Sequence, residues 1–373
     1  MQTINIGVLV LSALLLGACD SSSSTTNTTS SNKQAYTIVD TGQVGYYDAD
    51  GNEISAPVEN ESFYGQDAHY TGVQFSFTDN ADDTVTDTNT QLVWQQTPNA
   101  VGYSWSEAVE YCSSLTMAGS SDWRIPSLKE LFSLSDFSQG WPYIDTDYFD
   151  LAEGITKDEQ YWSSNFYEVG TTHGGADSAF GVNHVTGHIK AYPSDAGGQF
   201  GNYVRCVKGD TYGANSFVDN SDGTVTDEST GLMWMQNDTG VAVKWEDALL
   251  AAENATDDGY SDWRLPNVKE LQSIVDYSGN FPAIDTLFNC TGITNEAGEA
   301  DYGYYWTSTS ARFNEYGEYY YAWYVAFGRA VNDVGEDTHG AGAVRFDTKV
   351  VGGPLGEGGE RYYNHVRFVR DVK

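Results

Sequence analysis

The chain has 373 residues, and 53 acidic residues against 18 lysines and arginines give it a formal net charge of −35. So large an acidic excess repels the phosphates of nucleic acids and anionic lipid surfaces, and we expect binding to neither. The chain also contains 26 tyrosines and 10 tryptophans, whereas disordered chains are poor in aromatic residues. The composition therefore predicts a folded, strongly solvated protein.

The first 19 residues have the features of a lipoprotein signal peptide. Ile4 to Leu16 form an apolar run of the length found in secretory signals and too short to span a bilayer. Leu16-Gly17-Ala18-Cys19 resembles the lipobox of bacterial lipoproteins, so we expect Cys19 to be acylated. Met1 to Ile6 lack lysine and arginine, which leaves a plain cleaved signal or a chance match as alternatives. The predicted location is the cell envelope, with a lipid anchor in the outer membrane at the cell surface or in the periplasmic face of the inner membrane.

Two short segments precede the main part of the chain. Residues 20–34 are polar, small and nearly uncharged, so they cannot bury enough apolar surface to become ordered. They are predicted to be a disordered Ser/Thr tether. Residues 35–72 are predicted to form an N-terminal hairpin segment, because Tyr47–Ile54 contains an Asp50-Gly51 turn signal. No similar segment occurs later in the chain.

The main part of the chain is an internal repeat. Phe77–Gln96 recurs nearly letter for letter as Phe217–Gln236, at an offset of 140 residues. A repeat this long exceeds the roughly 20–50 residues of solenoid repeats, and each copy is large enough to bury a core of its own. We therefore expect two tandem domains, at residues 73–210 and 211–373.

Each copy carries two helix signals between strand signals. Residues 104–107 and 127–130, and 267–270 in the second copy, match the capping box that begins a helix, and apolar residues follow at helical spacing. The flanking segments are rich in Tyr, Thr and Val with Asp-Gly turns, and two of them, Thr224–Asp227 and Tyr320–Phe327, are typical of strands. The expected fold class is α+β, with two helices and short antiparallel strands in each copy.

The cysteines distinguish the two copies. Cys112 corresponds to Ala252 and Cys206 to Phe368, so the second copy lacks both thiols. Independent buried cysteines have no reason to be lost together, whereas a disulfide makes either cysteine useless without the other. We therefore predict a Cys112–Cys206 bridge, which an exported compartment permits. Cys290 is left over and is expected to be a buried or inert thiol, with a nucleophile as the alternative.

Acidic turns at equivalent places in the two copies contain oxygen ligands of the kind that Ca²⁺ prefers. The spacing and the final glutamate of an EF-hand are missing, and Asp-Gly before Thr-Val-Thr also suits a tight hairpin turn. We therefore predict hairpin turns and no cofactor, with calcium as the alternative. The candidate calcium ligands are Asp79, Asp82, Asp83, Asp87, Asp219, Asp222 and Asp227.

Two other groups of polar residues have both a functional and a structural interpretation. His184 and His188 would place two imidazoles across a turn for a transition metal, but zinc requires three or four ligands, so an exposed loop pair is the preferred interpretation. The aspartate and arginine of the Ser-Asp-Trp-Arg motifs, in Ser121–Pro126 and Ser261–Pro266, are either a ligand clamp or a brace. We expect them to brace the tryptophan and the start of the second helix.

Several short motifs occur in the same order in both copies, over roughly residues 73–208 and 213–373. They are Phe-x-Asp-Asn, Thr-Val-Thr-Asp, Leu-x-Trp, Trp-x-x-Ala, Ser-Asp-Trp-Arg-[Ile/Leu]-Pro, Lys-Glu-Leu, Tyr-Trp-[Ser/Thr]-Ser and Val-Arg-x-Val. This set resembles the C-terminal domain family of the Legionella collagen-like adhesin. The resemblance implies a C-type-lectin-like superfold, in which a cysteine on the first helix pairs with one in the last strand. It also implies surface adhesion or glycan binding, although a fold alone does not fix a function.

A binding role fits the remaining sequence features better than catalysis. The chain contains no Gly-x-Ser-x-Gly elbow, phosphate loop or zinc-protease signature. The second copy is longer, and long loops tend to carry function. Its aromatic side chains are expected to stack on sugar rings, although alternate members of a strand must face the core. The candidate ligand-binding residues are Tyr316, Tyr319, Tyr321, Trp323 and Tyr324.

The leading hypothesis is a non-enzymatic, lipid-anchored surface protein whose two lectin-like domains bind a glycan or an envelope or host protein. One alternative is a structural component of the cell envelope without a carbohydrate ligand. The other is a sulfatase-maturation-like enzyme on the same superfold, which would need a reactive thiol such as Cys290. The membrane is expected to be contacted through the lipid anchor only.

Overall fold

The computed structural model describes residues 35–157, 159–195, 202–314, 317–354 and 361–372. The predicted signal peptide, the acylation site Cys19 and the Ser/Thr tether lie outside these residues, as does Tyr316. Among the described residues, no helix is long and apolar enough to cross a bilayer.

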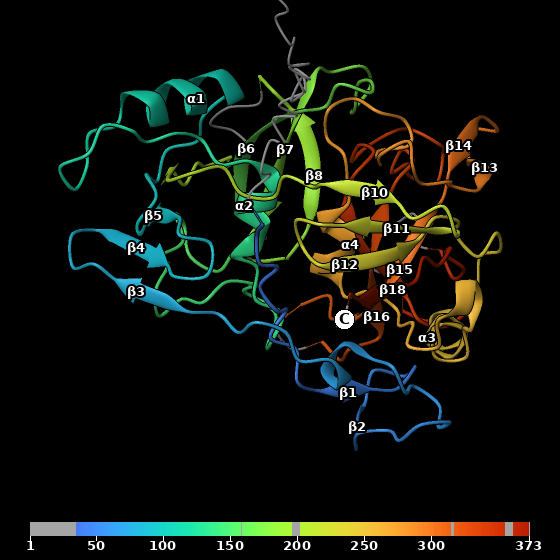
Figure 1. Ribbon diagram of the computed structural model, residues 1–373. Coiled ribbons are helices and arrows are strands. Elements are labelled where there is room, and N and C mark those ends of the chain that lie inside the picture. The colour runs from blue at the N-terminus through green and yellow to red at the C-terminus, as the bar shows by residue number, and fades with distance from the viewer. Residues whose placement is uncertain (1–34, 158, 196–201, 315–316, 355–360, 373) are drawn as a thin grey trace, which may run out of the picture. The chain divides into compact units, whose positions relative to one another are not determined.

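Both copies contain two α-helices among short strands, so the fold is of the mixed α+β class, as predicted (Figure 1). The elements of the first copy are β3 (Phe77–Asp79), β4 (Thr84–Asp87), β5 (Val93–Gln95), α1 (Trp105–Ser114), α2 (Leu128–Ser133), β6 (Gln160–Phe166), β7 (Ser178–Asn183), β8 (Ile189–Pro193) and β9 (Val207–Lys208). Those of the second copy are β10 (Phe217–Asp219), β11 (Thr224–Asp227), β12 (Leu232–Met235), α3 (Trp245–Glu253), η2 (Asp257–Gly259), α4 (Val268–Ser273), β13 (Gly292–Thr294), β14 (Ala300–Tyr302), β15 (Tyr304–Ala311), β16 (Tyr321–Ala326), β17 (Val344–Thr348) and β18 (Val369–Asp371). Ahead of both copies lie β1 (Tyr46–Tyr47), β2 (Glu53–Ile54) and η1 (Asp67–His69).

The predicted helix starts are confirmed. Helices α1, α2 and α4 each begin at a complete capping box, formed by residues 104–107, 127–130 and 267–270. In a capping box the first and last side chains each bind the backbone N–H of the other residue, which satisfies donors that the helix cannot. Helix α3 begins after Lys244 without a side-chain cap. Its first residue, Trp245, is fully buried instead, so tertiary packing holds this end of the helix.

In both copies the last strand returns to pair with the third, but the contact between the first helix and the last strand differs. Each copy has a four-stranded antiparallel sheet, in the orders β3-β4-β5-β9 and β10-β11-β12-β18, so that the last strand pairs with the third. In the first copy, the predicted disulfide between Cys112 on α1 and Cys206 before β9 is present, with 5.5 Å between the Cα atoms. In the second copy, Ala252 and Phe368 are buried in one apolar cluster. Apolar packing therefore replaces the bridge there.

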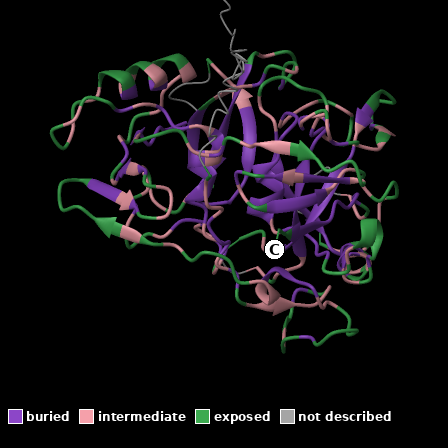
Figure 2. Ribbon diagram, in the orientation of Figure 1, coloured by how far each residue is buried: buried purple, intermediate pink, exposed green. Residues whose placement is uncertain are grey.

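The two copies also share one sheet. Its six strands have the order β15-β16-β17-β8-β7-β6, so each copy contributes three neighbouring strands, and β17 meets β8 at the antiparallel pair Val344 and Ile189. These strands are largely buried (Figure 2). The largest apolar cluster contains residues from both copies, while each copy keeps a smaller cluster under its first helix. The junction near residue 210 therefore separates two repeats but not two hydrophobic cores.

Residues 35–72 contain the predicted hairpin, whose strands β1 and β2 pair around the Asp50-Gly51 turn. The start of this segment binds both copies. Tyr36 N–H donates to Ser229 O of the second copy at 2.9 Å, and Thr41 O accepts from Phe137 N–H of the first copy at 2.7 Å. The segment therefore connects the repeats in space as well as preceding them in the sequence.

Candidate functional site

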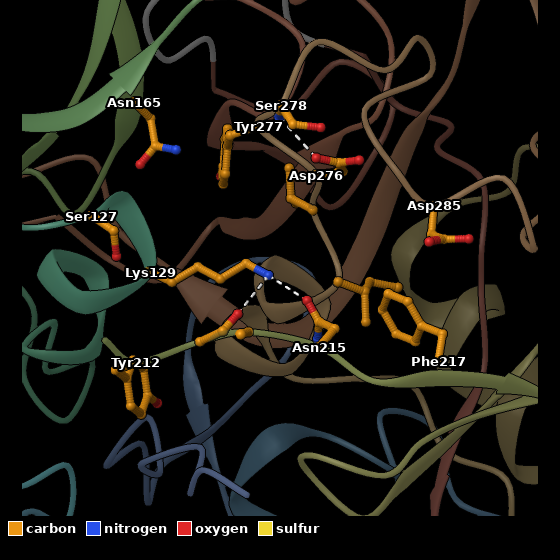
Figure 3. A pocket seen from close by; sticks show the side chains of 14 residues that line it. Ser127, Lys129, Asn165, Tyr212, Asn215, Phe217, Asp276, Tyr277, Ser278 and Asp285 are labelled. Carbon is orange, nitrogen blue, oxygen red and sulfur yellow. Dashed lines mark hydrogen bonds between the residues drawn. The ribbon is translucent and has the colours of Figure 1, made fainter. Parts of the chain in front are cut away.

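A pocket of about 510 Å³ lies where the two copies meet, beside helices α2 and α4 (Figure 3). We call it the open pocket. Figure 3 shows Lys129 extending from α2 toward Asn215, with Asp276, Tyr277 and Ser278 lying together on one side. Its lining residues are Ser127, Lys129, Asn165, Tyr212, Gly213, Ala214, Asn215, Phe217, Ile274, Val275, Asp276, Tyr277, Ser278 and Asp285. Charged, amide and aromatic groups therefore all face one space.

Lys129 comes from the Lys-Glu-Leu motif at the start of α2. Its Nζ donates to Ser273 O and Asn215 Oδ1 at 2.6 Å each and to Gly213 O at 3.2 Å. These three acceptors match the three donors of an ammonium group. Enclosure of the ammonium by protein lowers the pKa of Lys129 to about 8, although nearby Asp227 and Asp276 oppose that effect. The side chain is thus a structural cation at the base of the pocket and has no donor to spare.

Lys269, the equivalent residue in the second copy, makes the reciprocal contact. Its Nζ donates to Ser133 O and to Asp40 O at 3.0 Å each. Ser133 and Ser273 are the last residues of α2 and α4, where helix carbonyls have no partner within the helix. Each lysine therefore binds the C-terminal end of the other copy's short helix, where the helix dipole favours a cation. Burial lowers the pKa of Lys269 to about 7.

The opposite wall of the open pocket is acidic and already ordered. Burial would raise the pKa of Asp276, but hydrogen bonds from Ser278 and Asn280, together with the charge of Lys129, outweigh burial and lower it. The carboxylate accepts from Ser278 N–H at 2.8 Å and from Asn280 Nδ2 at 2.6 Å. Asp276 is therefore an ionised, fixed side chain and is poorly suited to act as a general base.

Two donors at the open pocket have no hydrogen-bond partner among the described residues. One is the backbone N–H of Tyr277, whose hydroxyl is used in a bond to Gly342 O at 2.9 Å. The other is the side-chain NH₂ of Asn165, whose oxygen accepts from Leu128 N–H at 2.8 Å. Ordered walls with free donors suit a polar ligand that supplies acceptors such as carbonyl or hydroxyl oxygens.

A second hollow, of about 810 Å³, shares Tyr212, Gly213 and Ala214 with the open pocket. Its other walls are loop residues 35–37, 89–91 and 209–211. Asp210 is the only charged residue among the described residues that line it. We therefore place the candidate site in the open pocket, where fixed charges and unpaired donors converge.

Four of the candidate calcium ligands, Asp79, Asp82, Asp219 and Asp222, bind within the hairpins in which they lie. Asp79 and Asp219 accept from backbone N–H groups two residues ahead, at 2.8 Å in both copies. Asp82 and Asp222 accept from the following threonine hydroxyls, Thr84 and Thr224, at 2.6 Å. Among the described residues, no group of three or more His, Cys, Asp or Glu side chains could hold a metal ion. These bonds agree with the hairpin interpretation.

Most of the aromatic residues predicted to stack on sugars lie inside the protein. Tyr321, Trp323 and Tyr324 belong to β16 and are buried. Both faces of this strand are covered, because Tyr321 and Trp323 pack in the largest apolar cluster and Tyr324 packs in the cluster under α3. These three side chains therefore have no surface on which a sugar ring could stack, which corrects the expectation for them. Tyr319 is half-buried and stacks on Tyr47, with 3.8 Å between ring centroids, and Tyr316 lies outside the described residues.

The histidine pair is not in an exposed loop, contrary to the preferred interpretation. His184 and His188 are both buried, and His184 packs against Tyr161 with ring centroids 5.0 Å apart. Burial, with the charge of Arg205 nearby, lowers the pKa of His184 well below its ordinary value. His184 is therefore a neutral core residue.

The arginines of the Ser-Asp-Trp-Arg motifs brace the second helix of each copy, as predicted, but through a different acid. Arg124 binds Glu130 with two bonds of 2.7 Å, and Arg264 binds Glu270 at 2.6 and 2.7 Å. Both glutamates also complete capping boxes. Such bidentate pairs fix geometry as well as charge.

Cys290 has the surroundings expected of an unreactive thiol. Burial raises its pKa, and the nearby charge of Arg367 offsets this only in part. Arg367 Nη2 lies 3.6 Å from the sulfur. Since the thiolate is the nucleophilic form, a raised pKa keeps Cys290 protonated and unreactive near neutral pH.

Sequence patterns did not single out Lys129, Asn165 or Tyr277. A signal for the lysine was present, because Lys-Glu-Leu recurs at the same place in both copies of a chain with only 18 basic residues. A lysine that both copies keep at the same place in a largely buried helix indicates a buried hydrogen-bond partner. No sequence pattern identifies the unpaired N–H of Tyr277, because its lack of an acceptor depends on where another segment of the chain lies.

Comparison with known proteins gives one result. The family described as the Lcl C-terminal domain matches residues 83–208 and again residues 223–346. The two matches fall in the two copies of the repeat and together cover more than half of the chain. No curated protein matches the sequence.

Proposed function

Because the chain belongs to the Lcl C-terminal domain family and carries this domain twice, we propose that it is a non-enzymatic surface protein that binds a glycan or an envelope or host protein. The family suggests an adhesin-like or surface-associated role. The observation that supports binding is the open pocket, where ordered charges surround two unpaired donors. Preordered polar groups with free donors are the usual features of a recognition site.

A C-type-lectin-like arrangement of each repeat is part of the proposal. Its support is the link between first helix and last strand, through Cys112 and Cys206 in the first copy and through apolar packing in the second. The fold hosts binding proteins and enzymes alike, so it does not decide between them.

We place the protein in the bacterial cell envelope, held to a membrane by lipid on Cys19. Support comes from the Leu-Gly-Ala-Cys motif and from a disulfide, which persists in oxidising compartments. Cells that express Cys19→Ser should incorporate no labelled palmitate into the protein and should release it from the membrane fraction. Unchanged labelling of that variant would refute the anchor.

The enzymatic alternative has little support at the only free cysteine among the described residues. A sulfatase-maturation-like reaction would need a reactive thiol, and burial raises the pKa of Cys290. Native protein should therefore react with iodoacetamide many times more slowly than after unfolding. Equal rates of alkylation in the native and unfolded protein would support the enzymatic alternative.

A glycan array tests the binding proposal. The full chain is applied with and without Ca²⁺ and at several salt concentrations, beside the variant Ser278→Phe, which fills the open pocket from an exposed position. We expect neutral or basic glycans to be favoured over sulfated ones, because the net charge is −35. The absence of a hit under every condition would remove the glycan ligand and leave an envelope or host protein, or a purely structural role.

A further inference from the structure

The open pocket has a counterpart elsewhere in the molecule that is already occupied. We found the equivalents of its wall residues in the other copy by adding or subtracting the repeat offset of 140. They include Phe75, Phe77, residues 134–138 and Lys269. We call this second place the filled pocket. Its occupant is Val39–Gln43, a stretch of the protein's own N-terminal segment.

The occupant is an extended chain held mainly through its backbone. Asp40 N–H donates to Val73 O at 2.8 Å, beside a parallel bridge between Val39 and Val73. Phe137 N–H donates to Thr41 O at 2.7 Å, and Lys269 Nζ donates to Asp40 O at 3.0 Å. Backbone bonds of this kind accept many sequences, as in the addition of a strand to a sheet edge.

Side chains add selectivity at the end of the occupant. The amide of Gln43 forms two bonds with the backbone of Ser310, donating to its oxygen at 2.9 Å and accepting from its N–H at 2.8 Å. Gly42 has φ of +79°, and a Cβ there would lie 3.0 Å from Asp136 Oδ1 and 3.4 Å from Phe75 and Ser138. The filled pocket therefore requires glycine at this position.

No segment like residues 35–72, which we call the leader, precedes the second copy, and the open pocket therefore lacks an occupant from the chain itself. Strand β9 ends at Lys208 and β10 begins at Phe217, so the connection is far shorter than residues 35–72. Tyr277 N–H occupies the place of Phe137 N–H and lacks an acceptor among the described residues. Asn165 occupies the place of Thr309, whose hydroxyl donates to Asp67 of the leader at 2.6 Å. The unpaired donors are thus the same positions that hold the leader in the filled pocket.

We infer that the open pocket binds an extended segment of another polypeptide, in the manner in which the filled pocket binds Val39–Gln43. A backbone carbonyl of the partner accepts from Tyr277 N–H, and a glycine faces Asp276 and Ser278. Lys129 remains a wall residue, since its donors are used. The net charge of −35 favours neutral or basic residues around the bound segment. This inference deepens the proposed binding function and rests on it.

The probe is a fluorescent peptide with the sequence of residues 37–44, Thr-Ile-Val-Asp-Thr-Gly-Gln-Val, titrated into the full chain and followed by anisotropy. We expect saturable binding of one peptide per chain, because the filled pocket is already occupied by the tethered leader. Replacing the peptide's glycine by valine should weaken binding at least tenfold, since valine disfavours positive φ. Ser278→Phe in the protein should weaken it at least tenfold as well.

Ser138→Phe is the matched control, because Ser138 is the equivalent of Ser278 in the filled pocket. It should lower stability and leave peptide affinity within about twofold. Failure of the unmodified chain to bind the peptide, or equal affinity for the glycine and valine peptides, would overturn the inference without any protein variant. A glycan hit that Ser278→Phe abolishes, without peptide binding, would overturn it too and leave the proposed function intact. Peptide binding beside an empty glycan array supports the inference and restricts the proposed function to a protein ligand.

Discussion

The two repeats have the same strand order around their first helix but are closed by different forces. In the first repeat a disulfide joins α1 to the residue before β9, and the apolar cluster beneath that helix contains eight buried residues among those that the structure describes. In the second repeat no disulfide is present at the equivalent positions, and the corresponding cluster contains seventeen buried residues within the described part of the chain. The comparison teaches that a covalent link and a larger apolar cluster are alternative ways to close one fold.

The largest expected effect comes from removing the bridge. The double variant Cys112→Ala/Cys206→Ala should lower the free energy of unfolding by about 4 kcal/mol, because a cross-link over 94 residues restricts the unfolded chain. Urea denaturation of the oxidised protein measures the change. Cys290→Ala serves as the control and should lose much less. A loss below about 1 kcal/mol for the double variant would show that packing already closes the first repeat.

The next effect concerns the filled pocket. Gly42→Ala should destabilise the protein by about 2–3 kcal/mol, because alanine at positive φ and the contact with Asp136 both cost free energy. Gly119→Ala is matched for conformation, with φ of +71° and nothing within 4 Å of its Cβ, and should cost about 1 kcal/mol. Equal losses of stability for the two variants, measured by thermal or urea unfolding, would mean that Gly42 is not in close contact with the walls of the filled pocket.

A smaller effect concerns the two reciprocal lysines and their pH dependence. Burial lowers the pKa of Lys269 to about 7 and of Lys129 to about 8, against 10.5 in an exposed lysine. Between the folded and unfolded pKa values the unfolded chain binds more protons, so the free energy of unfolding rises with pH in this window. For Lys269→Met the gain between pH 7 and pH 9 should shrink by about 1–2 kcal/mol, and for Lys129→Met by less.

Urea denaturation at pH 7, 8 and 9 measures these slopes against the unchanged protein. An unaltered slope in both variants would show that the two ammonium groups are better stabilised in the folded protein than their burial indicates.

The smallest expected difference lies at the equivalent aspartates of the two Ser-Asp-Trp-Arg motifs. Asp262 pairs with Arg370 at 2.6 Å near the surface, whereas Asp122 has no ion-pair partner among the described residues. Asp262→Ala should cost about 0.5 kcal/mol, and Asp122→Ala should be neutral within the precision of urea denaturation. A larger loss at Asp122 would contradict the assignment of the brace to Arg124 and Glu130.

Much of the local structure could be predicted from the sequence, because its causes are local. Capping boxes identified three helix starts, and the joint loss of Cys112 and Cys206 from the second copy identified the bridge. The Asp50-Gly51 turn was also found at its place. Each of these features depends on a few residues whose chemistry or spacing is visible in the chain.

The candidate site depends on long-range packing and was therefore missed. Strand β16 was recognised, but no pattern showed that apolar clusters on both of its faces would bury Tyr321, Trp323 and Tyr324. Nor did any pattern show that Val39–Gln43 would fill one of two equivalent pockets. A backbone segment that docks through N–H and C=O groups leaves little trace in its side chains.

The reciprocal contacts of Lys129 and Lys269 are those that two identical subunits make across a twofold axis, where each donates what it receives. A symmetric dimer of single repeats would carry two equal docking positions and would behave as a bivalent molecule. Joining the subunits in one chain, with one leader for two positions, breaks that equality. Under the proposed binding each chain offers one open position, so avidity would require several copies of the chain held together.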